Sequence, residues 1–199
     1  MRVIVLCEES QVICKEFRNK GHEAYSCDLQ DCSGGHPEWH IKADALSVLN
    51  DGWDLMIGHP PCTRLSNSGV WYIVKHQLWA ELMDACSFFL KLWSAPIDKI
   101  CLENPIQHGY ARKYIPKYDQ IIQPYNFGED ASKATCLWLK GLKPLENTEY
   151  FPPRMVDGKK RWSNQTDGGW NKLSPSADRS KLRSKTYPGI ARAMADQWG

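Results

Sequence analysis

The feature that most restricts the fold of this chain is the alternation of short apolar runs with stretches of helical spacing. The apolar run 3–6 and the largely apolar segments 54–57 and 99–102 have the length of buried strands, and 23–26 reads as a further strand closing at Asp28. Helical spacing is present in 12–20 and 78–93. Two more strands are expected at 120–123 and 136–139, and a short helix at 189–198. This order predicts an α/β fold, with a mostly parallel sheet covered by helices on both faces.

Residues able to do chemistry gather at the carboxyl ends of the expected strands. They are Glu8, Glu9, Asp28, Pro61, Cys62, Glu103 and Asn104. Ligands of such sheets bind outside the carboxyl ends of the strands. The sequence therefore predicts one site at this edge.

The first turn and the second strand indicate a cofactor that carries a nucleoside. Asp28 lies about twenty residues after the first strand, where an acid binds ribose hydroxyls. The first turn reads CEESQ (7–11) and has no glycine-rich phosphate loop. Its two acids would repel a pyrophosphate but suit a cationic sulfonium or amino group. The alternative is a solvated acidic turn.

Cys62 is the candidate nucleophile. Pro60 and Pro61 place its thiol on a rigid turn, and Arg64 is among the polar residues that follow. An exposed, electropositive setting favours the reactive thiolate, whereas a lone cysteine is more often buried and structural. Glu103, at the end of the next strand, could hold a proton for a heterocycle nitrogen.

These motifs carry a resemblance to a known family. "PPC" after one strand and "ENP" after the next resemble the catalytic pair of the DNA cytosine C5-methyltransferases, and "FGEDASKATCLWL" (127–139) resembles a later strand of that family. The segments CEESQ, GHEAYSCDL, CSGGHPEWH, GWDLMIGHPPCT and YPGIARAMADQW are similar to short methyltransferase-like proteins common in bacteriophage genomes.

The resemblance implies a Rossmann-like fold that binds S-adenosylmethionine (SAM), with Cys62 and Glu103 as the catalytic residues. The implied cofactor-binding residues are Glu8, Glu9, Ser10, Asp28, Asp44 and Pro61. The implied substrate-binding residues are Pro61, Arg64, Asn104, Lys133 and Thr135. The implied reaction adds the Cys62 thiolate to C6 of a cytosine, flipped out of any duplex, while Glu103 protonates N3.

Three features depart from the family pattern. The glycine-rich first turn is replaced, Lys133 and Thr135 stand where the family has two arginines, and the large target-recognition domain is absent. We therefore expect a SAM-binding catalytic domain at 1–141, a short basic substrate-contacting segment at 142–187, and a C-terminal helix at 188–199 that packs back on the catalytic domain.

The expected substrate is DNA or a pyrimidine nucleotide. From Arg154 to Arg192 there are ten lysines and arginines but only three acids, with Trp162 and Trp170 among them. Such a segment can follow a phosphate backbone and stack on bases, although by composition alone a solvated loop with packed tryptophans is favoured. The same chemistry on a free nucleotide or single strand, and a non-catalytic SAM- or nucleotide-binding protein, stay open as alternatives.

Composition predicts a cytoplasmic protein, and the resemblance to phage-encoded proteins implies the cytoplasm of a bacterial host. No apolar run approaches a transmembrane helix, the N-terminus does not read as a signal peptide, and most of the eight cysteines lie in apolar runs typical of reduced, buried thiols. The sequence leaves the oligomeric state open. A zinc site at Cys27, Cys32, His36 and His40 has plausible spacing, but we favour a loop without metal because Asp28 already has a cofactor role.

Overall fold

The core of the protein is a twisted sheet whose central strands are buried on both faces. The computed structural model describes residues 1–174, 176 and 179–199. Within these residues the main sheet has seven strands in the order β3-β2-β1-β4-β5-β7-β6. The strands are β1 (Arg2–Leu6), β2 (Glu23–Asp28), β3 (His40–Lys42), β4 (Leu55–Gly58), β5 (Lys99–Pro105), β6 (Gln120–Ile122) and β7 (Thr135–Lys140). The first five are parallel, and β7 runs antiparallel between β5 and β6.

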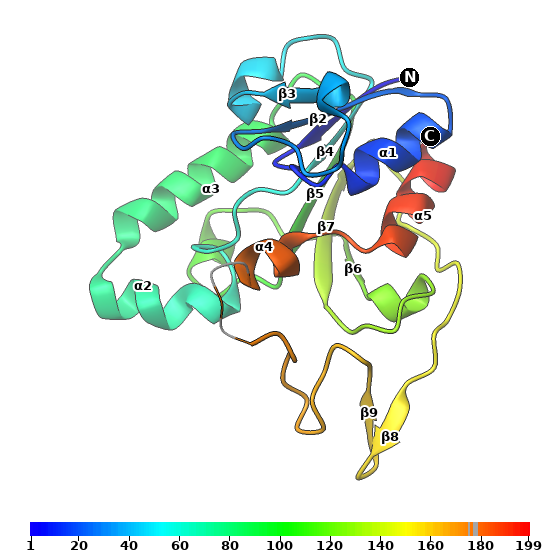
Figure 1. The fold of residues 1–199 in the computed structure, drawn as a ribbon. Helices are drawn as coiled ribbons and strands as arrows, with labels where there is room; N and C mark the ends of the chain where they lie inside the picture. The colour runs from blue at the N-terminus through cyan, green and yellow to red at the C-terminus, as the bar shows by residue number, and fades with distance from the viewer. Residues whose placement is uncertain (175, 177–178) are drawn as a thin grey trace.

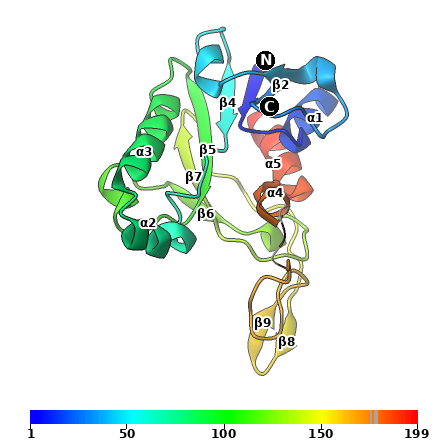
Figure 2. The ribbon, with the colours of Figure 1, turned by 60° about the vertical axis from the view of Figure 1, so that its left-hand side comes forward.

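Helices cover both faces of this sheet, as the sequence predicts (Figures 1 and 2). Ile4 and Leu6 pack in a cluster with Phe89 of α3 (Trp79–Trp93). Val3 and Val5, which alternate with them, belong to a second cluster that contains residues of α1 (Val12–Asn19) and α5 (Pro188–Trp198). Successive strand residues point to opposite faces, so the continuous apolar run of β1 serves two cores at once.

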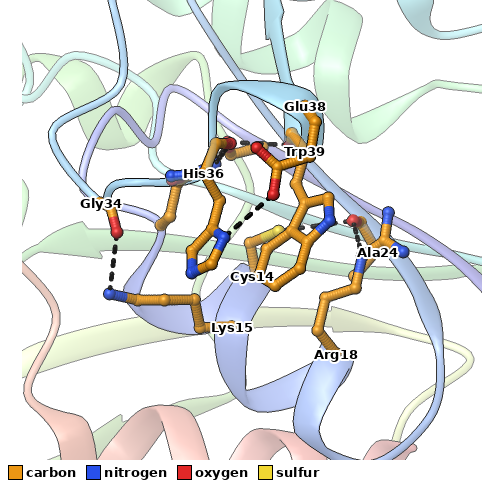
Figure 3. Close-up of polar contacts among 10 residues, drawn as sticks. Cys14, Lys15, Arg18, Ala24, Gly34, His36, Glu38 and Trp39 are labelled. Atoms are coloured by element: carbon orange, nitrogen blue, oxygen red, sulfur yellow. Dashed lines mark hydrogen bonds and ion pairs between the residues drawn. The ribbon is translucent and has the colours of Figure 1, made fainter.

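The loop between β2 and β3 closes tightly over the first turn. Gln11 has a positive φ of 58°, and its buried side chain donates to the carbonyl of His36 at 2.8 Å and accepts from the His36 amide at 3.1 Å. A Cβ on Gly34 would lie 2.5 Å from the Cβ of Gln11, so only glycine fits there. Figure 3 shows the neighbouring contacts, in which Lys15 of α1 donates to the Gly34 carbonyl.

The segment after β7 leaves the body and returns. It forms a protruding hairpin of β8 (Arg154–Val156) and β9 (Lys159–Arg161), then α4 (Arg179–Ser184), and ends in α5 (Figure 1). Trp162 is buried and stacks on Tyr125 with ring centroids 4.1 Å apart, so this tryptophan packs on the body. Trp170 is 80% exposed. The expected 142–187 segment includes 175, 177 and 178, which lie outside the described residues.

The expected elements are present, with shifted ends. The sequence did not predict β3, the β8–β9 hairpin, α4 or α2 (Val70–His76). These elements are short, and α2 has only one fully buried residue, Ile73, so they lack a periodic apolar pattern. No helix in the described part of the chain is long and apolar enough to cross a membrane.

Candidate active site

The site lies where the strand order reverses, between β1 and β4. In open α/β sheets this reversal leaves a crevice at the carboxyl ends of the strands. The first turn (7–11) follows β1, and the turn from His59 to Cys62 follows β4. The His59 amide donates to the Leu6 carbonyl at 3.0 Å, which holds the two turns side by side.

Pairing of β4 with β5 brings the two catalytic motifs together. Gly58 lies opposite Leu102 in the parallel register, so the residues after each strand emerge at the same edge. The amide nitrogen Nδ2 of Asn104 donates to the Pro60 carbonyl at 2.7 Å and ties the "ENP" segment to the "PPC" turn. Cys62 is exposed, as the nucleophile hypothesis requires, and so is Pro61.

Glu103 pairs with a histidine that the sequence analysis did not single out. His59 Nδ1 lies 3.3 Å from Glu103 Oε2, and the two side chains are 15% and 9% exposed. Burial alone would raise the pKa of Glu103, but the hydrogen bond and charge of His59 lower it below its ordinary value. Burial would likewise lower the pKa of His59, and Glu103, followed by Glu8, raises it instead. The pair therefore favours a carboxylate beside an imidazolium.

The buried polar atoms at this edge that have no hydrogen-bond partner among the described residues include Nε2 of His59 and Oδ1 of Asn104. Buried polar atoms are nearly always paired, so unsatisfied ones call for a partner that arrives from outside. A polar heterocycle in the crevice would supply that partner.

Lys133 and Thr186 both act on Glu103. The charge of Lys133 and a side-chain hydrogen bond from Thr186 both lower the pKa of Glu103. Thr135 is buried opposite Pro105, and its hydroxyl donates to the Lys133 carbonyl at 3.2 Å. Of the two residues at the family's arginine positions, only Lys133 therefore presents charge to Glu103.

Asp28 and Asp44 converge on the end of β1. Burial, with a further contribution from the nearby charges of Asp28 and Asp44, raises the pKa of the Cys7 thiol to about 12. Asp28 accepts one hydrogen bond, from the Gln30 amide to Oδ1 at 2.9 Å, and Asp44 accepts one from the Leu46 amide at 2.9 Å. The two acids give this end of the crevice a negative potential.

Glu8 serves the fold. Its two carboxylate oxygens accept from the amides of Ile13 at 2.7 Å and Cys14 at 3.3 Å, at the start of α1. Burial raises its pKa to about 7, although His59 and these two amides act in the opposite direction. The sequence predicts that Glu8 binds the cofactor. In the structure its carboxylate already accepts hydrogen bonds from the start of α1. Glu9 is buried beside it, and Ser10 is partly exposed.

Arg64 has a charged partner that the sequence analysis did not anticipate. Its guanidinium forms an ion pair with Glu81 of α3, with NH2 to Oε2 at 2.7 Å and Nε to Oε2 at 2.8 Å. Residues 62–76 fold as a turn, a short 3-10 helix and α2, and α3 supplies the partner of Arg64.

The zinc alternative has no support from the arrangement of its ligands. Both ring nitrogens of His40 are engaged, Nδ1 with Ser26 Oγ and Nε2 with the Gln30 carbonyl, each at 2.8 Å. The His36 ring stacks on Trp39 with centroids 3.8 Å apart. Within the part of the chain that is described, no three His, Cys, Asp or Glu side chains group as metal ligands.

Two functional residues were missed for different reasons. His59 directly precedes "PPC". Its place on a turn that faces a strand-end acid could have marked it as a candidate site residue. Thr186 reaches Glu103 from the far end of the chain, and no local pattern marks it.

Comparison with known proteins supports the fold. No family model and no curated protein matches the chain. A methyltransferase of Entamoeba histolytica has a similar structure, with a TM-score of 0.50 and 13% identity over 76% of this chain and 58% of that one. A prophage-encoded E. coli protein, described as a DNA modification methyltransferase, aligns with a TM-score of 0.47 and 16% identity over 79% of this chain and 53% of that one. The chain thus spans little more than half the length of each. It has the Rossmann-like α/β fold of methyltransferases.

Proposed function

We propose that this chain transfers a methyl group from SAM to C5 of cytosine in DNA, through a covalent bond between Cys62 and C6 of the base. The observation that carries the proposal is the contact between the two motifs. An exposed cysteine on a proline-fixed turn stands at the same sheet edge as a buried carboxylate, and Asn104 ties the two segments together at 2.7 Å.

The residues around the β1 end fit SAM. Its sulfonium and ammonium groups are cationic, and the negative potential of Asp28 and Asp44 suits them. Asp28 keeps one carboxylate oxygen for a ribose hydroxyl, since only Oδ1 is engaged within the described residues. When bound there, SAM supplies an electrophilic methyl carbon. Because Glu8 is held by α1, we assign the cofactor's amino group to Glu9, Ser10 and Asp44 rather than to Glu8.

Each residue of the site has a separate part in the proposed reaction. The Cys62 thiolate sulfur forms a bond to C6, the electron pair of the C5–C6 double bond moves into a new C4–C5 double bond, and the C4–N3 pair moves onto N3, which takes a proton through Glu103. Because Glu103 rests as a carboxylate, that proton comes from the His59 imidazolium across the 3.3 Å contact. We assign Lys133 to the ring oxygen, because its charge already lowers the pKa of Glu103 beside it. After C5 gains the methyl group it loses its proton to solvent, and the S–C6 bond breaks to restore the ring.

Pro60 and Pro61 contribute by limiting motion. Their rings fix the backbone of the turn, so less entropy is lost when the sulfur is aimed at a ring carbon. The buried pair of His59 and Glu103 sits behind this turn and excludes water from the proton-bearing side of the base.

A trapping experiment tests the proposal. A DNA oligonucleotide with 5-fluorocytosine in place of cytosine keeps the enzyme attached after methyl transfer, because fluorine cannot leave C5 as a proton does. We expect mass spectrometry to find protein, oligonucleotide and methyl group in one adduct, mapped to Cys62. Cys32→Ser, which removes another partly exposed thiol, should form the adduct, and Cys62→Ser should not.

The substrate arm of the same assay separates the alternatives. An adduct with the free 5-fluoro nucleotide and none with the oligonucleotide would show a nucleotide enzyme. SAM binding without any adduct would favour a non-catalytic binding protein, for which the occupied Glu8 and the closed first turn are the supporting features.

A further inference from the structure

Two segments beside the candidate nucleophile contain no acidic residue. Residues 63–80 follow Cys62, and residues 104–118 follow Glu103. Together they carry five lysines and arginines: Arg64, Lys75, Arg112, Lys113 and Lys117. In a chain of nearly balanced charge, with 25 basic and 23 acidic residues, this absence of acids marks a locally cationic surface.

The structure joins these segments into one unit. Ser66 and Gln107 form an antiparallel bridge, and the Asn67 amide donates to the Ile106 carbonyl at 3.1 Å. The His108 amide in turn donates to the Leu65 carbonyl at 3.1 Å. The unit begins at the catalytic turn itself, because the Cys62 carbonyl accepts from the amides of the third and fourth residues after it. Figure 2 shows α2 beyond the carboxyl ends of β4 and β5, next to α3.

Large aromatic rings on this unit face solvent. Trp71 is 65% exposed, Tyr72 47%, and Trp79 and Tyr110 41% each. Trp79 and Tyr110 also meet edge to face, with centroids 5.0 Å apart, although they come from different segments. We call these four residues, with Arg64, Lys75 and Lys113, the aromatic face. Several exposed aromatic rings gathered together mark a binding surface more often than isolated ones do.

Cations accompany three of the four rings. Lys75 Nζ lies 4.6 Å from the ring centre of Trp71, Lys113 Nζ lies 5.8 Å from that of Tyr110, and the Arg64 guanidinium carbon lies 5.5 Å from that of Tyr72. Arg64 is already paired with Glu81, but an apolar protein partner would bury the charges of Lys75 and Lys113, for which no ion pair is present among the described residues, at a high cost in desolvation. A polyanion whose units carry flat rings satisfies both features, since phosphates pair with the cations and bases stack on the aromatic rings.

We propose that the aromatic face binds a single-stranded stretch of nucleic acid next to the target base, with bases stacked on Trp71 and on the Trp79–Tyr110 pair. Bases within a duplex already stack on each other and present only their edges, so a stacking surface selects unpaired strands. This inference rests on the proposed function for the identity of the target base. It specifies where the substrate binds and that the bound strand is single. It also assigns substrate contact to residues outside the β8–β9 hairpin.

Binding of a labelled oligo(dT) strand, measured by fluorescence anisotropy without SAM, tests the aromatic face alone. The strand contains no cytosine, so turnover plays no part. Trp71→Ala should weaken binding roughly tenfold or more, the usual effect of losing one stacked base, while Trp71→Phe should retain most of the affinity. Lys75→Gln should lower the slope of log Kd against log salt by about 0.7. Binding of a duplex of the same length should change little.

Trp170→Ala is the matched control, because Trp170 is an exposed tryptophan on the hairpin segment. The proposal is overturned if this variant loses single-strand binding while Trp71→Ala keeps it, or if Trp71→Ala weakens single strand and duplex equally. It is also overturned if sedimentation shows a wild-type dimer that Trp71→Ala abolishes, which would assign the face to a second copy. Loss of trapping at Cys62 with strand binding intact would refute the proposed function and leave the face as a binding site.

Discussion

Replacing Glu8 with glutamine tests whether this buried carboxyl serves the fold or the cofactor. In the structure its two oxygens accept from the first amides of α1, and its pKa rises from 4.5 to about 7 because it is buried. A carboxyl whose pKa is raised by folding destabilises the protein as the pH rises from the unfolded pKa toward the folded one. One pKa unit corresponds to about 1.4 kcal/mol. The raised pKa of Glu8 therefore lowers the free energy of unfolding by about 1 kcal/mol at pH 5 and by about 3 kcal/mol at pH 8.

Glutamine keeps one acceptor oxygen for the Ile13 amide and cannot ionise. We therefore expect the stability of Glu8→Gln relative to wild type to increase by about 2 to 3 kcal/mol between pH 5 and pH 8, as measured by urea unfolding at each pH. Comparing the two proteins at each pH cancels the titration of other groups. A constant difference across this range would refute the assignment of a raised pKa. Loss of SAM binding in the folded variant would return Glu8 to the cofactor site.

Two further predictions concern the site itself. His59→Gln should lower kcat while leaving SAM affinity nearly unchanged, with His22→Gln, outside the site, as the control. Because Glu103 raises the pKa of His59, the wild-type proton donor is charged below pH 6.5 and loses its proton as the pH rises through that raised value. The kcat profile should therefore fall above pH 6.5 in wild type and lose this limb in the variant, and an identical profile in both would contradict the role of His59. Asp28→Asn keeps the acceptor for the Gln30 amide but removes the charge, so SAM binding by calorimetry should weaken roughly 10- to 100-fold, as expected for a lost hydrogen bond to a charged group. Asp51→Asn, an exposed acid at the opposite end of the sheet, should bind SAM as wild type does, and equal affinity in both variants would remove Asp28 from the site.

The parts of the fold that depend on periodic apolar runs could be predicted from the sequence. Residues 3–6, 55–57 and 100–102 are continuous apolar runs because both faces of those strands are buried, and the strand-end positions of Cys62 and Glu103 follow from the last two. Periodicity cannot predict a short helix or strand that buries few side chains. For that reason α2, with one buried side chain, went unpredicted even though it carries the exposed Trp71.

The candidate site was predicted as a location more reliably than as a set of contacts. Parallel strands must end at one edge, so the convergence of Glu103 with the "PPC" turn required only strand order. The partner of a charged side chain depends on side-chain direction in three dimensions. Arg64 turns to Glu81, and Glu8 to the start of α1, since each finds a nearer partner there than the expected one.

The two halves of the core also differ in when they can form. The cluster under α3 is assembled from residues between Ile4 and Trp138. The cluster on the other face needs Ile190, Met194 and Trp198 of α5, which pack against the same first strand from the far end of the chain. Joining such distant segments carries a large loop-closure entropy and slows folding. During synthesis on the ribosome, the α3 side can therefore consolidate first, while Val3, Val5 and Phe17 stay uncovered until α5 emerges. Transient protection of this apolar surface, by a chaperone or by rapid completion of translation, is then a condition for a good yield of native protein.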